Sequence, residues 1–164
     1  MKKILIVLVV LAISFNAYAK KQKAPDVIRV DSGTGIASMG LVFDASYDPR
    51  TDNILPGHKI LSVAITNNSI NILKMDALKD EWQVVDYKGG NHTAINDLRK
   101  QAPDMYINLP EKLRHLVAYP EMIQVGDTKV IDLIFKDSVN LEAFRMVKFM
   151  NSDKKVKLEI NAKD

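Results

Sequence analysis

Cysteine is absent from the 164 residues, and aromatic residues make up only 7% of them. A chain without cysteine has no disulfide, no thiolate ligand for a metal ion, and no lipid-modified cysteine of the kind that anchors bacterial lipoproteins. Histidine is also scarce, with three in the whole chain. Stability must therefore come from a packed core, and any metal site from imidazole, carboxylate or thioether groups.

The first 19 residues have the three parts of a secretory signal peptide. Two lysines follow the first methionine, residues 4–15 are mostly apolar, and Ala17-Tyr18-Ala19 places small residues before a cleavage site. The apolar stretch is shorter than the roughly 20 residues that span a bilayer, which argues against a membrane anchor. We expect cleavage after Ala19, which leaves residues 20–164 as a periplasmic or secreted protein that does not span the membrane.

Charge is nearly balanced once this segment is set aside. The full chain has 23 basic and 20 acidic residues, and the first 19 residues hold two of the lysines and no acid. The remaining 21 basic residues leave a net charge near +1. No basic cluster interleaved with aromatic residues occurs, and such clusters are typical of nucleic-acid binding. We expect no nucleic-acid partner.

Most of the remaining chain alternates apolar and polar residues in the manner of β-strands. The clearest run is HKILSVAITNNSI at residues 58–70, in which Leu61, Val63 and Ile65 form an apolar face that is expected in the core. Asn67-Asn68-Ser69 then predicts a turn, because asparagine tolerates left-handed backbone angles and bonds to its own backbone. A strand or a connection is predicted at residues 70–73, and further strands are predicted at residues 27–30, 36–47, 82–87, 122–125, 128–136, 144–150 and 156–160.

Residues 92–119 break this pattern. Ile95 and Leu98 are three residues apart with polar residues between them, which predicts a short helix over 93–100 that ends before Pro103. Proline is also favoured at the start of a helix, where no N–H is needed, so LPEKLRHLV at residues 109–117 predicts a second helical segment.

The number of strands decides the fold class. About seven to nine short strands separated by turns, with this little helix, favour an antiparallel sandwich over a chain of alternating strands and helices. The prediction is a mainly β fold, an antiparallel immunoglobulin-like β-sandwich. It forms one domain over residues 20–164, with a short helical insertion at about 92–119.

Three stretches carry a family resemblance. The run KILSVAITNNS, the turn VGDT followed by KVIDLIF, and the closing VKLEI resemble telokin-like, immunoglobulin-like domains of secreted bacterial proteins of unassigned function. The resemblance lies in the order and style of the strands and includes no catalytic motif, and the helical insertion is longer than in that pattern. It implies a binding or accessory role and identifies no residues that perform it.

Catalytic and metal-binding motifs are weak in this sequence. There is no G-x-S-x-G, and His58, His92 and His115 each stand at a turn or helix edge, where exposed loop histidines are common. We expect no enzyme activity, no cofactor and no metal site. A small periplasmic metal-binding carrier is the alternative, because imidazole with carboxylate or methionine suits zinc or copper. That alternative predicts that at least two histidines converge.

One acidic loop also has two interpretations. Asp48 and Asp52 have the spacing of two ligands in a calcium-binding loop, but Pro49 and Arg50 interrupt the pattern, and the glycine and distal glutamate of an EF-hand are missing. A solvated acidic loop fits the sequence better.

The insertion is the predicted functional surface, because loops on a rigid β framework often carry function and Tyr and Arg often dominate interfaces. The predicted partner-binding residues are Tyr106, Arg114, His115 and Tyr119. We expect an exported, non-catalytic binding or accessory protein that binds an envelope or extracellular protein, for example as a subunit of an envelope or secretion assembly. In the structural alternative, the apolar residues of 113–117 only close the end of the sandwich.

Overall fold

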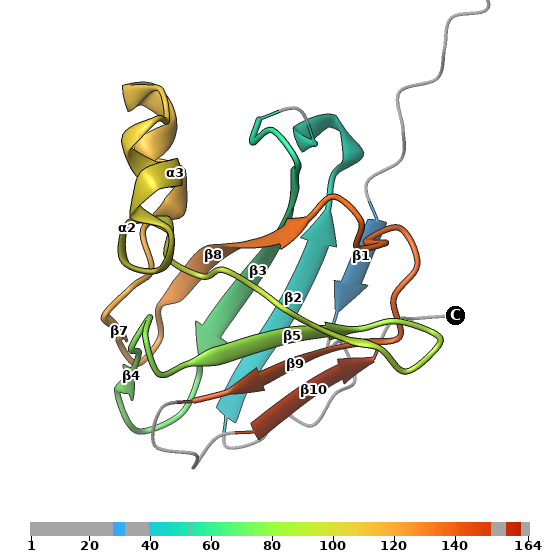
Figure 1. Cartoon of the computed structure of the whole chain (residues 1–164). Helices are drawn as coiled ribbons and strands as arrows, with labels where there is room; N and C mark the ends of the chain where they lie inside the picture. Colours follow the sequence, from blue (N-terminus) through green and yellow to red (C-terminus); the bar gives the residue numbers. More distant parts are fainter. Residues whose placement is uncertain (1–27, 32–39, 53, 152–156, 162–164) are drawn as a thin grey trace, which may run out of the picture.

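The computed structural model of the chain describes residues 28–31, 40–52, 54–151 and 157–161, and it describes side chains within 40–52, 54–114 and 118–151. It is mainly β, with antiparallel sheets and two short helices (Figure 1). The predicted signal peptide, residues 1–19, lies outside the described residues. No helix among the described residues is long and apolar enough to cross a membrane.

Among the described residues, ten strands form two four-stranded sheets and one short pair. The first sheet contains, in spatial order, β1 (Ile28–Asp31), β2 (Leu41–Tyr47), β3 (His58–Asn67) and β8 (Thr128–Lys136). The second contains β10 (Lys157–Asn161), β9 (Met146–Met150), β5 (Glu81–Val85) and β6 (Asn91–Thr93). The short pair joins β4 (Leu73–Lys74) to β7 (Met122–Ile123). All of these pairs are antiparallel.

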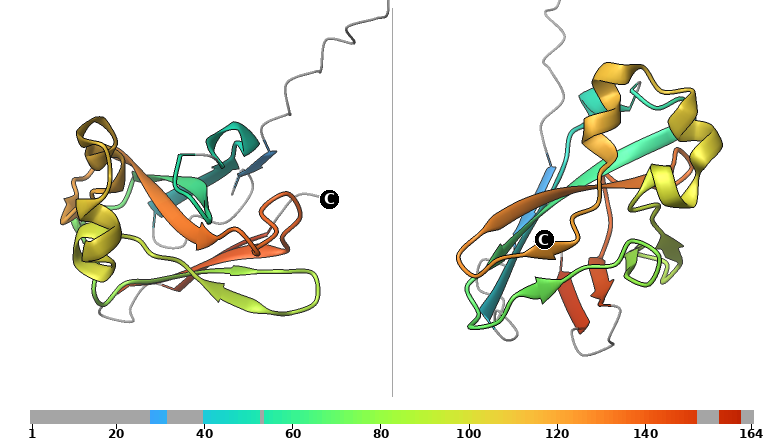
Figure 2. Two further views of the ribbon diagram at one scale, coloured as in Figure 1. Left: turned by 45° about the horizontal axis from the view of Figure 1, so that its top comes forward. Right: turned by 90° about the vertical axis from the view of Figure 1, so that its left-hand side faces the viewer.

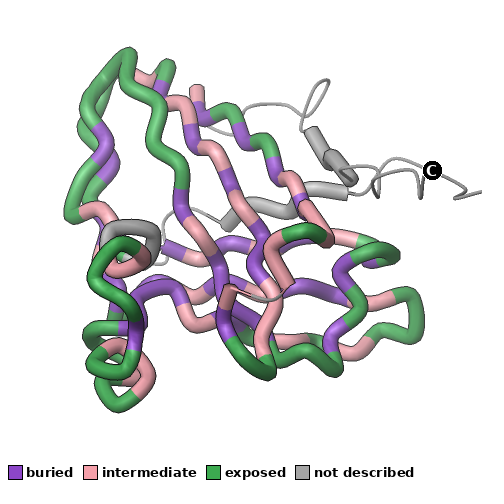
Figure 3. Tube along the Cα trace, turned by 90° about the horizontal axis from the view of Figure 1, so that it is seen from above, coloured by how far each residue is buried: buried purple, intermediate pink, exposed green. Residues whose placement is uncertain are grey.

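The predicted core face of β3 is confirmed. Leu61, Val63 and Ile65 have no exposed surface, and Leu133 and Ile131 of β8, which pair with Leu61 and Val63, are buried with them. Because successive side chains of a strand point to opposite faces, one apolar face per strand is enough to fix its orientation. In Figure 3, buried residues alternate with less buried ones along these strands, and the turns are mostly exposed.

The two four-stranded sheets form two layers around a shared core (Figure 2). The ring centroid of Phe43 in β2 lies 6.3 Å from that of Trp82 in β5 and 6.1 Å from that of Phe149 in β9. Trp82 and Phe149 stack within the second sheet at 4.2 Å. Aromatic pairs of this kind add about 0.5–1.5 kcal/mol to the burial of their area. These three rings therefore join the two layers.

The predicted turn after β3 is present and rests on one buried side chain. Asn67 Oδ1 accepts from Ser69 N at 3.1 Å, and Asn67 Nδ2 donates to Asn71 O at 2.9 Å and to Ile123 O at 3.0 Å. The segment at 70–73, predicted as a strand or a connection, is mostly a connection, because Asn67 bonds the backbone of Asn71 and pairing begins only at Leu73, in β4.

The predicted helix over 93–100 is also largely wrong. Thr93 ends strand β6, and Ile95 pairs instead with Ile134 of β8, with N···O distances of 2.8 and 2.9 Å. Helix α2 (Leu98–Gln101) begins only where the side chain of Asp97 accepts from Lys100 N at 3.1 Å. That bond caps the first turn of the helix.

Proline positions set the rest of the insertion. Pro103 does not only end the preceding helix but also starts α3 (Pro103–Ile107). Pro110 precedes the 3-10 helix η3 (Glu111–Val117), as the sequence predicted for a second helical segment. Proline suits both places because the first turn of a helix needs no N–H donor.

The insertion covers part of the outer face of the first sheet and forms a second core. Ile60 of β3 and Ile134 of β8 belong to the faces that the alternation turns away from the main core, yet they are only 7% and 1% exposed. Leu98 of α2 and Leu109 pack against them. The insertion is therefore an integral part of the fold.

Candidate partner-binding cleft

A hollow of about 210 Å³ opens in the surface of the helical insertion. Its lining comes from α2, α3, η3 and the chain that leads to β7. The lining residues are Asp97, Arg99, Lys100, Tyr106, Arg114, Ala118, Tyr119 and Glu121. We refer to this hollow, with these residues, as the cleft. Three of the four residues predicted to bind a partner thus line one cavity.

Arg114 is held in place by the backbone around it. Its Nε donates to Leu109 O and its Nη2 to Ile107 O, both at 3.2 Å. Its guanidinium carbon lies 5.7 Å from the ring centroid of Tyr106, close enough for a cation–π contact. Both side chains are half-buried. The chain thus fixes an aromatic ring and a cation side by side at the surface.

Helix α2 contributes two more cations, which the sequence analysis did not single out. Arg99 and Lys100 are exposed in its last turn. Within the described part of the chain, no ion pair joins either residue, or Arg114, to a carboxylate. Their signal in the sequence was a pair of basic residues near a helix end, which is common on solvated helices and so does not indicate a site.

The two acidic residues of the cleft differ in burial and in hydrogen bonding. Asp97 is 5% exposed, and its carboxylate caps α2 through Lys100 N. Glu121 is exposed. The cleft therefore presents three cations and one solvent-exposed carboxylate.

Tyr119 lines the cleft but belongs to the core. It is 7% exposed, its hydroxyl accepts from Trp82 Nε1 at 2.9 Å, and it donates to Asp80 Oδ2 at 3.0 Å. Burial raises the pKa of the Tyr119 hydroxyl well above its ordinary value of 10.0, and the Asp80 carboxylate raises it further. The hydroxyl stays protonated and keeps its hydrogen bonds in the core, so Tyr119 contributes to the cleft only as part of its lining.

His115, the fourth predicted residue, belongs to η3, and its side chain lies outside the described residues. The other two histidines lie in different sheets. His58 Nδ1 contacts Pro56 O at 3.0 Å, and His92 Nε2 contacts Asp86 Oδ2 at 3.0 Å. No cluster of three potential metal ligands occurs in the part of the chain that the structure describes.

The acidic loop after β2 has structural partners for its carboxylates. Asp48 pairs with Arg50 at 2.6 Å, and Arg50 is the main cause that lowers the pKa of Asp48 below its usual value. Tyr47 donates its hydroxyl to both carboxylate oxygens of Asp52, at 2.8 and 2.9 Å. The Asp48 carboxylate thus pairs within the loop, and the Asp52 carboxylate bonds the hydroxyl of Tyr47 at the end of β2.

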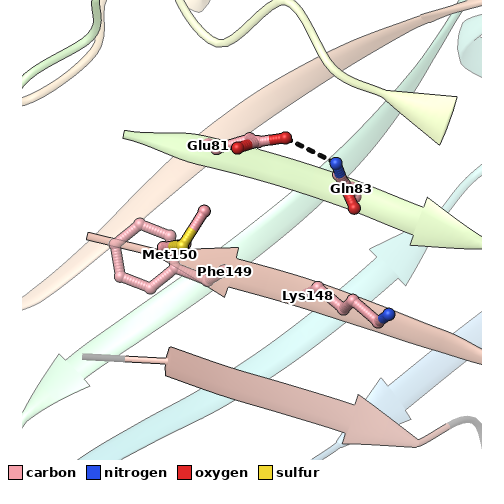
Figure 4. A pocket seen from close by; sticks show the side chains of 5 residues that line it. All are labelled: Glu81, Gln83, Lys148, Phe149 and Met150. Atoms are coloured by element: carbon pink, nitrogen blue, oxygen red, sulfur yellow. Dashed lines mark hydrogen bonds between the residues drawn. The ribbon is translucent and has the colours of Figure 1, made fainter. Parts of the chain in front are cut away.

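A second hollow, of about 250 Å³, lies on the second sheet (Figure 4). Its lining residues are Glu81 and Gln83 of β5 and Lys148, Phe149 and Met150 of β9. Register places Glu81 opposite Met150 and Gln83 opposite Lys148, and the Gln83 amide donates to Glu81, as the dashed line shows. Sequence analysis missed this hollow, because such neighbours across strands become visible only once the strands are paired.

The size of the two hollows limits the ligands that they can hold. Sites for small molecules and cofactors usually enclose about 300–1,000 Å³. Both hollows are smaller than this range, and both suit one or two inserted side chains. Of the two, the cleft combines a fixed arginine, an aromatic ring and cations without ion-pair partners. We therefore take it as the candidate functional site.

Comparison with protein-family models, with curated proteins and with solved structures gives no match to this chain.

Proposed function

We propose that the protein is an exported, non-catalytic binding protein of the bacterial envelope, and that its cleft captures another envelope or extracellular protein. In this proposal the two layers are an immunoglobulin-like sandwich of the telokin-like type, residues 1–19 are a signal peptide, and the insertion is the recognition element. The mature protein works in the periplasm or outside the cell, as an accessory subunit of a larger assembly.

One observation carries the proposal: the insertion holds Tyr106 and Arg114 against each other at 5.7 Å beside a small hollow. Tyr and Arg are the side chains that most often dominate protein interfaces, because they combine large contact area with directed hydrogen bonds. Their fixed positions reduce the conformational entropy that binding would otherwise cost.

Crosslinking in producing cells tests the surface directly. A photoreactive amino acid replaces Tyr106 in one strain and Tyr87 in another. Tyr87 is 60% exposed in the turn after β5, at the opposite end of the second sheet from α2 (Figure 1). We expect a crosslinked partner, identified by mass spectrometry, from position 106 and none from position 87. Equal yields at the two positions would refute the surface.

Affinity for that purified partner gives the second measurement. Tyr106→Ala with Arg114→Ala should weaken binding tenfold or more, which corresponds to about 1.4 kcal/mol. The matched control, Tyr87→Ala with Arg145→Ala, removes the same side-chain types from the opposite end and should leave binding unchanged. Thermal melts of both double variants separate lost contacts from lost folding.

Export has its own test. The N-terminal sequence of protein recovered from the periplasm or medium should begin at Lys20, because Ala17-Tyr18-Ala19 meets the small-residue requirement of signal peptidase. Recovery only in membranes, with Met1 retained, would contradict the proposal.

A further inference from the structure

We propose that the occupant of the cleft is an acidic segment of a partner protein, in which a carboxylate side chain stands beside an apolar one. This inference rests on the proposed function and adds the chemistry of the ligand. Three features support it: the charge of the cleft, the geometry of Arg114 and the exposed Ile107, whose carbonyl accepts from Arg114.

The charge of the cleft favours an anionic group. Arg99, Lys100 and Arg114 have no ion-pair partner within the described residues. Asp76 is the acid that Lys100 affects, but it is paired with Lys79 at 3.0 Å, and Lys100 is the smallest of the causes that lower the pKa of Asp76. A carboxylate that enters the cleft thus meets cations with no competing ion pair. Complementary charge of this kind favours both encounter and correct pairing.

Arg114 is prepared to bind a carboxylate. A guanidinium has five N–H donors in a plane, and the two hydrogen bonds to the backbone of Leu109 and Ile107 use two of them. The remaining N–H groups keep the fixed fork that matches carboxylate oxygens. Since the side chain is already ordered against Tyr106, binding loses little of its rotamer freedom.

The apolar part of the ligand is indicated by Ile107. It follows Tyr106 in α3, and 67% of it is exposed. Its carbonyl accepts from Arg114 Nη2 at 3.2 Å, so an exposed aliphatic residue lies beside the guanidinium and favours a ligand with an apolar residue next to its carboxylate. The cleft volume of about 210 Å³ fits side chains of a peptide better than a whole small molecule.

Phosphate-rich ligands fit less well. Proteins that bind anionic lipid surfaces or nucleic acids present several basic residues over a broad face. Here the cations surround one small hollow, and the exposed Glu121 stands on its rim. A carboxylate at that position repels a polyanion but leaves room for a single acidic side chain among neutral neighbours.

A displayed library of random octapeptides, with acidic and basic residues at equal frequency, tests the ligand class on residues 20–164. We expect selected peptides to be enriched at least tenfold in Asp or Glu adjacent to Leu, Ile, Val or Phe. Their binding should weaken as salt rises from 0.05 to 1 M, because the screening length falls to about 3 Å at 1 M. The library is also selected against two variants of the protein. The triple variant Arg99→Gln, Lys100→Gln and Arg114→Gln should lose the acidic enrichment.

The matched control neutralises three exposed cations elsewhere, with Lys88→Gln, Lys136→Gln and Arg145→Gln, and should retain the enrichment. Several outcomes overturn the inference: no acidic enrichment, equal loss in both triple variants, or cleft-dependent binding to phosphatidylglycerol vesicles with no peptide selected. Circular dichroism confirms that each variant is folded before selection.

Failure of this inference differs from failure of the proposed function. If capture of the crosslinked partner falls with Tyr106→Ala but survives the neutral triple variant, the cleft binds a partner by other chemistry and only the acidic class is refuted. If capture is insensitive to both variants, the cleft is not the binding surface.

Discussion

The hydroxyl of Tyr119 bridges two buried groups, and its removal gives a sharp test of the fold. Trp82 Nε1 donates to it at 2.9 Å, and it donates to Asp80 Oδ2 at 3.0 Å. Trp82 is 1% exposed and Asp80 5% exposed, so water has little access to either group. Tyr119→Phe removes both hydrogen bonds and keeps the ring that fills the space.

The size of the effect follows from these two losses. A buried donor left without a partner costs about 1–3 kcal/mol, and a hydrogen bond to a charged group contributes about 1.5–3 kcal/mol. Because neighbouring side chains relax in part, we expect Tyr119→Phe to lower the free energy of unfolding by about 3 kcal/mol. With a urea dependence of about 1–3 kcal/mol per molar, the midpoint of unfolding falls by at least about 1 M.

Urea unfolding is measured by fluorescence, since Trp82 is the only tryptophan in the chain. Circular dichroism serves as a second probe, because the substitution changes the surroundings of the indole itself. Tyr87→Phe removes a hydroxyl from a side chain that is 60% exposed, and it should change stability by less than about 0.5 kcal/mol. If Tyr119→Phe is equally mild, the hydroxyl does not contribute to stability in the way argued here.

Three further predictions concern packing and pH. Leu98 has no exposed surface and belongs to the second core, so Leu98→Ala should lower the free energy of unfolding in urea by about 2–5 kcal/mol. A loss below about 0.5 kcal/mol, as expected for a surface residue, would mean that the insertion is not packed on the sheet. Val63→Lys should prevent folding, as judged by circular dichroism, because it buries an ammonium group. Ala64→Lys, on the outer face, should lower the free energy of unfolding by less than about 1 kcal/mol. Equal losses in the two variants would contradict the orientation of β3. The hydrogen bond from His92 is the main cause that lowers the pKa of Asp86 below 3.8, so this carboxylate stabilises the fold above about pH 4 and loses that effect as pH falls through its lowered pKa. The difference in thermal midpoint between wild type and Asp86→Asn should therefore shrink as pH falls below about 4, and a difference that grows below pH 4 would refute this sign.

Strands with one apolar face could be predicted from the sequence. The strand predicted at 128–136 has the bounds of β8, and β3 buries Leu61, Val63 and Ile65 as expected. Both results follow from a period of two, which a strand imposes on every residue and which therefore repeats over a long run. The core between the two four-stranded sheets follows from these local patterns together with the pairing of strands.

Burial on the outer face could not be predicted in the same way. Ile60 and Ile134 stand where the alternation expects exposed residues, and the residues that cover them, such as Leu98 and Leu109, come from a distant part of the chain. The spacing of Ile95 and Leu98 also fits two structures equally well. In the structure, Ile95 lies in an extended segment that bridges to β8, and Leu98 is the first residue of α2. A single three-residue spacing between apolar residues therefore does not distinguish a helix from an extended segment.

The cleft was predicted only in part for a related reason. Tyr106 and Arg114 were chosen by residue type, and the structure brings them together through backbone carbonyls that no side-chain pattern reports. Tyr119 was chosen on the same ground, but a tyrosine suits a core as well as an interface when its hydroxyl finds a buried partner. Only the position of Asp80, near Tyr119 in space and distant in sequence, separates the two roles.

The insertion is fixed to both sheets, and this arrangement explains how it can both stabilise the fold and present a rigid cleft. Leu98 packs on the outer face of the first sheet, while Tyr119 bonds to Trp82 of the second. Between these attachments, the guanidinium of Arg114 lies 5.7 Å from the ring centroid of Tyr106, and Tyr106 also packs against the second core. Stability and partner capture should therefore separate in the folded protein: Tyr119→Phe lowers the free energy of unfolding and leaves capture intact, whereas Tyr106→Ala lowers capture even where circular dichroism shows the variant to be folded.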